Sequence, residues 1–309
     1  MTSLFQDENS PLRQYFQNND VFILDRGFRD SINLLQQCNY RTYMPESLLQ
    51  GEHQLTTAQA NRNRCVTLCR WVVEVVNGYF KRDYRLFRFD HFNKTVPHMF
   101  TYFKIAAALL NKFGVRLVDR VDAEPILNAL RERMPLQNNL ASVVSELNLN
   151  RRASLFRSMT VNNDVIFPRL EYNELILFAL GTYQIRLARS YYAEHIRPQG
   201  IYIIEVSREV FDVHRYHLRG SGENSLIRAR IKSRHVGRRQ YYVYILIENN
   251  VDGREGIIEY CCSCLVGRRT VGCCAHVMSI VWYLGWARHQ DNIVPPATFL
   301  DDVIVRDIE

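Results

Sequence analysis

Five of the eight cysteines in this chain of 309 residues fall between Cys261 and Cys274, and His276 follows two residues later. One arrangement of this cluster is C-x-C, nine intervening residues and C-x-H, which uses Cys262, Cys264, Cys274 and His276. Three thiolates and an imidazole suit tetrahedral Zn2+, and four protein ligands are typical of a structural zinc site. A C-x-C pair on an extended segment also places both sulfurs on one face. The cluster therefore predicts a structural Zn2+ site.

The sequence leaves two questions about this cluster: which four residues bind the metal, and whether the cysteines bind a metal at all. A second register, with Cys261, Cys264, Cys273 and His276, has the spacings C-x2-C and C-x2-H, which are also typical of zinc. Disulfides and buried free cysteines are the other interpretations. The N-terminus lacks the basic-then-apolar pattern of a secretory signal. We therefore expect a reducing compartment, in which clustered cysteines favour metal over disulfides.

The order C-x-C…G-x-C-x-H, followed by an apolar helix, resembles the SWIM zinc finger over about residues 255–285. This finger occurs in transposases of the Mutator type and in chromatin- and ubiquitin-linked proteins. The resemblance implies that the ligands are Cys262, Cys264, Cys274 and His276.

Composition narrows the classes of partner. The formal net charge is +7 and 47% of the residues are hydrophobic, as in a globular protein. A basic chain favours an acidic partner, and nucleic acid before a membrane. No run of eighteen apolar residues is present, so we expect no membrane span and a nuclear or cytoplasmic protein.

The first third of the chain alternates between strand and helix patterns. Residues 21–24 and 40–44 are predicted as strands, with a helix at 28–38 between them, which indicates an α/β layer. Residues 58–82 are predicted as one long helix with an apolar stripe. On this helix Arg70 and Glu74 have the i, i+4 spacing of an ion pair.

Asp25 directly follows the first strand, where α/β sheets often place a catalytic carboxylate, although a loop or capping role is the common alternative. The motifs DVFILDRGFRDS, MP, NRCVTLCRWVVEVVNGYFK and HMFTYFKIAAALLNKFG, within residues 5–117, resemble the C-terminal part of a PIF/Harbinger DDE transposase. The resemblance implies a partial RNase H-like domain. It also implies that Asp25 and Glu74 are two of three carboxylates that hold two Mg2+ ions for phosphodiester cleavage.

The first aspartate of such a triad belongs on an earlier strand. Only Asp7 and Asp20 precede Asp25, and neither follows an apolar run. We therefore expect a remnant of a transposase without its own nuclease activity, in which Mg2+ binds only if upstream sequence completes the site.

The remainder of the chain changes from helix to strand. Residues 115–149 are predicted as two helices broken at Pro135, 150–170 as a boundary loop, and 170–196 as a helix interrupted by Gly181. The predicted fold is α/β followed by α+β, with a partial RNase H-like domain at 1–117 and a helical connector at 118–200. A β-rich domain at 201–309 then carries a small antiparallel sheet, the finger at 260–285 and a C-terminal helix.

Cations alternate with apolar residues before the cysteines, which places them on one face of a sheet. The predicted nucleic-acid contacts are Arg228, Arg230, Lys232, Arg234, Arg238 and Arg239, with Arg268 and Arg269 in the zinc loop. These cations suit phosphate contacts or a solvated sheet face. The neighbouring Tyr241, Tyr242 and Tyr244 suit stacking on bases or packing in the protein.

Three functions fit these observations. The first is a transposon-derived zinc module that binds DNA or a protein. The second is a Mg2+-dependent DDE transposase or endonuclease fragment. The third is a zinc-dependent protein-interaction adaptor.

Overall fold

The computed structural model describes residues 5–88, 96–115, 117–118, 121–159, 167–195, 202–220, 223–233 and 238–291. The chain forms two compact units. The N-terminal unit consists of Met1–Glu46 and Arg62–Val121, and the finger unit consists of Ser47–Asn61 and Asp122–Glu309. The finger unit therefore includes the region expected as a helical connector, and a short segment from the first third of the chain.

The N-terminal unit contains the predicted strand–helix–strand arrangement. Strand β1 (Val21–Ile23) pairs in parallel with β2 (Arg41–Tyr43), and the connection contains the 3-10 helix η2 (Arg26–Ser31) and helix α2 (Ile32–Gln37). A small core beside these strands is formed by Phe5, Leu24, Leu35 and Tyr40.

The single helix expected over residues 58–82 is instead two helices. Helix α3 (Thr57–Cys69) and helix α4 (Trp71–Asp83) meet at Arg70. The expected apolar stripe is not buried as a whole, since Val73 and Val76 are exposed. The sequence does not indicate this interruption, because no glycine or proline occurs near Arg70.

The N-terminal unit also contains helix α6 (Met99–Phe113). Phe103 of α6 stacks on Phe80 of α4, with ring centroids 4.7 Å apart. Phe100 is nevertheless 85% exposed, and Ile105 and Leu109 are also exposed.

The finger unit is built on a five-stranded antiparallel sheet with the order β3-β4-β5-β6-β7. The strands are β3 (Phe156–Ser158), β4 (Tyr202–Ser207), β5 (Asn224–Lys232), β6 (Gln240–Glu248) and β7 (Ile257–Cys262). Strands β4 to β7 lie in the region expected to form a small antiparallel sheet. The fifth, β3, occurs in the expected boundary loop, because three residues are too few to show an alternating pattern.

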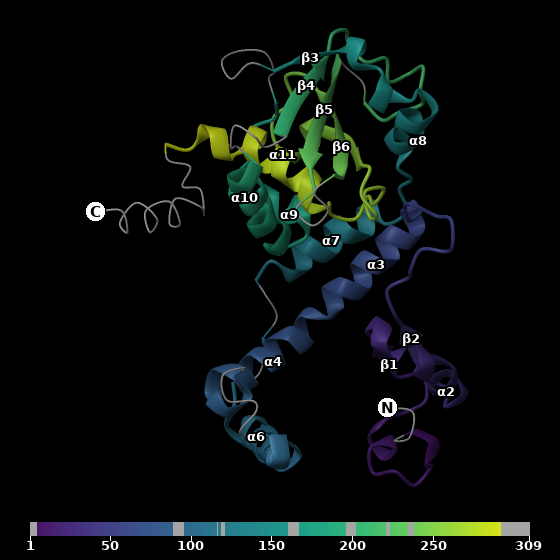
Figure 1. The fold of residues 1–309 in the computed structure, drawn as a ribbon, viewed down its shortest axis with the longest axis vertical. Helices are drawn as coiled ribbons and strands as arrows, with labels where there is room; N and C mark the ends of the chain where they lie inside the picture. Colours follow the sequence, from purple (N-terminus) through teal and green to yellow (C-terminus); the bar gives the residue numbers. More distant parts are fainter. Residues whose placement is uncertain are drawn as a thin grey trace. The chain divides into compact units, whose positions relative to one another are not determined.

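Helices cover both faces of this sheet (Figure 1). The helices of the unit are α7 (Ala123–Arg133), α8 (Asn139–Glu146), α9 (Tyr172–Ala179), α10 (Tyr183–His195) and α11 (Ala275–Gly285). The apolar side chains of α9, α10 and α11 share one core with Ile227, Ala229 and Ile231 of β5. Those of α8 share a second core with Leu226 of β5 and Tyr244 of β6.

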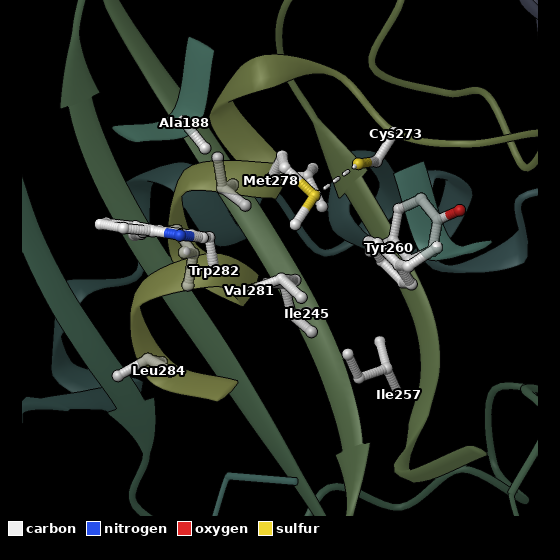
Figure 2. Packing of buried hydrophobic residues seen from close by; sticks show 14 of the residues in the cluster. Ala188, Ile245, Ile257, Tyr260, Cys273, Met278, Val281, Trp282 and Leu284 are labelled. Carbon is white, nitrogen blue, oxygen red and sulfur yellow. Dashed lines mark hydrogen bonds between the residues drawn. The ribbon is translucent and has the colours of Figure 1, made fainter. Parts of the chain in front are cut away.

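Helix α11 is apolar nearly all round and is buried as such a helix requires. Met278, Val281 and Trp282 of α11 pack over Ile245 of β6, and Tyr260 of β7 lies beside them (Figure 2). No described helix of the protein is long and apolar enough to cross a membrane.

Candidate metal centre

The side chains of Cys262, Cys264, Cys274 and His276 converge at the end of the sheet. Their ligand atoms all lie within 4.8 Å of one another, and all four residues are buried. The distance from Cys262 Sγ to His276 Nδ1 is 3.7 Å. A tetrahedron with ordinary Zn–S and Zn–N bond lengths has a corresponding edge of about 3.6 Å. The donor set and its dimensions therefore fit a tetrahedral Zn2+ ion.

Two regular elements position these ligands. Cys262 is the last residue of β7, and Cys264, two residues later, belongs to the same buried core. Cys274 is the N-cap of α11, where its Sγ accepts a hydrogen bond from the Val277 N–H at 3.5 Å. His276 lies in the first turn of that helix. The four ligands thus join the end of a strand to the beginning of a helix.

Strand alternation separates the two registers that the sequence leaves open. Cys261 lies opposite Tyr244 and belongs to the core beside α8, whereas Cys262 lies opposite Val243 and belongs to the core beside α11. Neighbouring residues of a strand point to opposite faces, so Cys261 cannot join Cys264. Cys273 instead donates its thiol hydrogen to Met278 Sδ at 3.7 Å within the core (Figure 2). The structure therefore brings together the four residues of the first register.

The loop between the ligand pairs turns tightly. The Cys262 N–H donates to the Gly267 carbonyl at 3.0 Å, and the Gly267 N–H donates to the Cys264 carbonyl at 2.9 Å. A Cβ atom at Gly267 would collide with the Cys262 carbonyl and lie 2.8 Å from the Cys262 Cβ. Gly272 has a φ of 61°, a left-handed conformation that favours glycine. Both glycines are thus needed for the path of the loop.

His276 has a polar partner on the side away from the sulfurs. The hydroxyl of Tyr191, on α10, lies 3.0 Å from His276 Nε2, and the ring of Tyr241 lies 4.3 Å from the imidazole. A metal on Nδ1 leaves the ring proton on Nε2, which then donates to the Tyr191 hydroxyl. Such outer partners orient a metal-binding imidazole. Tyr191 is 85 residues from the histidine in sequence, so no local pattern identifies it.

The pKa values of the ligand thiols are shifted in opposite directions. Burial, together with Cys264 and Cys274, raises the pKa of the Cys262 thiol. Burial also opposes ionisation of Cys274, but hydrogen bonds from Cys262 and Cys264 and the adjacent His276 outweigh it and lower its pKa well below the usual value. A thiolate must form at each sulfur that binds a metal, so metal binding at this site is coupled to loss of protons.

The two carboxylates singled out in the sequence lie in the N-terminal unit. Asp25 follows β1 and caps η2, where its Oδ1 accepts the Arg26 N–H at 2.7 Å. Its Oδ2 accepts a hydrogen bond from Arg70 Nη2 at 3.2 Å, so the predicted pairing of Arg70 with Glu74 is replaced by an ion pair with Asp25. Glu74 is exposed on α4. Within the described ranges, no metal-binding group of three or more side chains includes Asp25 or Glu74.

The predicted cations differ in how deeply they are buried, and Arg228 is the most buried of them. Arg228 is only 1% exposed, and its Nε donates to Glu205 Oε2 at 2.8 Å. Its Nη1 donates to the Leu149 carbonyl at 3.1 Å, and its guanidinium lies 4.1 Å from the ring centroid of Phe156. Arg228 therefore does not lie on a solvated face, because α8 and the residues after it cover that side of β5.

The other predicted cations range from buried to exposed. Arg269 is also buried and donates to the Val266 carbonyl, and Arg230 lies 3.5 Å from Glu205. Arg234 lies outside the described residues. Among the described residues, the predicted cations that are exposed or half-buried and form no ion pair with a carboxylate are Lys232, Arg238, Arg239 and Arg268.

The three tyrosines proposed for base stacking also differ in their burial and contacts. Tyr244 is buried and its hydroxyl donates to Asn150 Oδ1 at 3.0 Å. Tyr241 packs against His276, and Tyr242 is half-buried. Tyr244 therefore takes the packing role that the sequence offered as its alternative.

No curated protein and no solved structure matches the chain. The Cys/His region has no match to a SWIM family. The family described as DDE superfamily endonuclease matches residues 5–111, a range that contains Asp25 and Glu74. Residues 5–111 are thus the part of the chain that is similar to the DDE superfamily endonucleases.

Proposed function

We propose that this protein is a zinc-binding, transposase-derived protein whose finger unit is a SWIM-type module that binds DNA, without nuclease activity of its own. The convergence of four buried ligand atoms within 4.8 Å is the observation that carries the proposal. Zn2+ held by Cys262, Cys264, Cys274 and His276 has a full set of protein ligands, so its role is structural. It fastens the end of β7 to the beginning of α11.

A basic hairpin end beside this centre supports DNA as the partner. Lys232, the last residue of β5, pairs with Gln240 at the beginning of β6. Arg238 and Arg239 directly precede that position, and both are exposed. The Ser263 N–H, next to Cys262, donates to the Tyr242 carbonyl on the same end of β6. The cations and the metal centre therefore share one end of the sheet, and the DDE match of residues 5–111 also suggests interaction with DNA.

DNA binding is expected to weaken steeply with salt and to depend on this hairpin end. Each phosphate contact contributes a slope of about −0.9 to the dependence of log K on log[salt] for duplex DNA. A variant with Lys232, Arg238 and Arg239 all replaced by Gln is expected to lose up to about 3 units of that slope. Fluorescence anisotropy on duplex DNA from about 50 to 200 mM salt measures it.

The matched control removes three exposed arginines elsewhere in the finger unit. Its substitutions are Arg131→Gln, Arg152→Gln and Arg215→Gln. An equal loss in both triple variants would show a nonspecific effect of net charge. No DNA affinity of the natural chain at about 50 mM salt would overturn the DNA proposal and favour the protein-interaction adaptor.

The second candidate, a Mg2+-dependent nuclease, is favoured by the family match around Asp25 and Glu74. Both oxygens of Asp25 are engaged, by the Arg26 N–H and by Arg70. Two carboxylates are also too few for a two-metal clamp on the attacking and leaving oxygens. We expect the natural chain with Mg2+ to cleave plasmid DNA no faster than Asp25→Asn or Glu74→Gln. Cleavage that both substitutions abolish would contradict this and assign a working DDE site.

A further inference from the structure

The segment Ser47–Asn61 lies against the metal loop, although more than 200 residues separate them in sequence. The segment belongs to the finger unit, and its last five residues are the first five of α3. Leu55 anchors it: its N–H donates to the Leu265 carbonyl at 3.0 Å, and its side chain is buried. Neither the family match nor the cysteine pattern predicts this contact.

Gln54 binds the backbone at both cysteines of the C-x-C pair. Its Nε2 donates to the Cys262 carbonyl at 2.6 Å and to the Cys264 carbonyl at 2.7 Å. Its Oε1 accepts a hydrogen bond from Arg268 Nε at 3.0 Å. One side chain thus fixes the separation of two ligand-bearing residues and also holds the following part of the loop.

Asn61 binds the second half of the same loop. Its Oδ1 accepts the Thr270 N–H at 2.9 Å and the Val271 N–H at 3.2 Å, while its Nδ2 donates to Thr270 Oγ1 at 2.8 Å. Asn61 is 2% exposed, so these hydrogen bonds are shielded from water. Their loss would leave buried backbone donors unsatisfied. The two amide side chains together hold the loop on either side of Gly267.

We propose that Ser47–Asn61 is an integral part of the metal centre, in which Gln54 and Asn61 are positioning residues that hold the ligand loop closed. This inference rests on the proposed zinc site. If the segment stabilises the metal-bound loop, then bound metal must stabilise the segment by the same free energy. Metal occupancy therefore controls the order of Ser47–Asn61, which includes the first turn of α3. The finger then cannot be separated from the DDE-matching part of the chain, because the match at residues 5–111 contains this segment.

The test uses the full chain and the variant Gln54→Met, which keeps the length of the side chain and removes its hydrogen bonds. The affinity for Zn2+, measured by competition with a chromophoric chelator, is expected to fall about 10- to 100-fold, as for other outer partners of metal ligands. The d–d spectrum of the Co2+-loaded variant is expected to remain tetrahedral, because all four ligands are retained. Gln50→Met, at an exposed position of the same segment, is the matched control and is expected to leave the affinity unchanged.

A second pair of measurements separates positioning from general destabilisation. Leu140 belongs to the core beside α8, away from the metal ligands, so Leu140→Ala is expected to lower the thermal stability of the finger unit. Its Zn2+ affinity, measured well below the unfolding temperature, is expected to stay unchanged. In the natural chain, chelation is expected to accelerate hydrogen exchange at the Leu55, Thr270 and Val271 amides, which the segment and the loop protect mutually.

The outcomes distinguish this inference from the proposal on which it rests. A natural chain that binds no metal overturns the zinc site itself. A natural chain that binds Zn2+, with unchanged affinity in Gln54→Met and unchanged exchange at Leu55 on chelation, overturns the role of the segment alone. A Leu140→Ala variant that loses affinity as Gln54→Met does would also overturn it.

Discussion

Loss of the metal is expected to open the loop around Cys264 and to destabilise the finger unit severely. Structural zinc sites contribute on the order of 10 kcal/mol of binding free energy that is coupled to folding. Cys274→Ser removes one ligand but keeps an N-cap for α11, because a serine hydroxyl also accepts hydrogen bonds from the first backbone N–H groups of a helix. We expect the purified variant to retain little zinc by atomic emission and to lose the cooperative thermal unfolding of the finger unit. Chelation of the natural chain is expected to have the same effect.

Cys273→Ser is the control for this prediction, because Cys273 is adjacent, buried and bonded to Met278 rather than aimed at the ligands. It is expected to keep the full zinc content, with a loss of stability of about 1–3 kcal/mol for a hydroxyl placed in an apolar site. Zinc loss in Cys273→Ser equal to that in Cys274→Ser would contradict the register. A natural chain with less than about half an equivalent of zinc would contradict the site itself, since structural zinc is bound tightly.

Arg228→Met is expected to lower the free energy of unfolding by about 3–5 kcal/mol, because it leaves a buried carboxylate without its main partner. The side chain of Glu205 is 9% exposed and that of Arg228 is 2% exposed. Arg230, at 3.5 Å from Glu205, is a weaker replacement because its own side chain is one-third exposed. Urea denaturation followed by circular dichroism measures the loss. The half-buried Lys232 is the control, and Lys232→Met is expected to change stability by less than about 0.5 kcal/mol.

The double variant Arg228→Met with Glu205→Leu tests the cause of that loss. Removing both members of a buried ion pair leaves no uncompensated charge, so much of the lost stability is expected to return. The two interpretations of Arg228, phosphate binding and a buried ion pair, predict different results. A role in phosphate binding predicts weaker DNA binding with unchanged stability, whereas the buried pair predicts lower stability first. Weaker DNA binding in a fully stable Arg228→Met variant would contradict the structural role.

The metal centre could be predicted because its ligands lie close together in the sequence. Ligand types and spacing depend on chemistry within fifteen residues, and strand alternation at Cys261 and Cys262 follows from the two-residue repeat of a strand. The strand–helix–strand arrangement around Asp25 was predictable for the same reason. The outer partner of His276, Tyr191, was not, since it comes from α10.

The sequence by itself determined the residue types that can bind metal, the order of most strands and helices, and the resemblance around Asp25 and Glu74. The tertiary structure decided which helices cover each face of the five-stranded sheet. Alternation places Arg228 on one side of β5, but only the packing of α8 and Leu149 makes that side a core instead of a surface. Only tertiary structure brings Gln54 and Asn61 to the cysteine loop. The physical reason is that local periodicity reports which side chains share a face, whereas burial and long-range hydrogen bonds depend on segments distant in the chain.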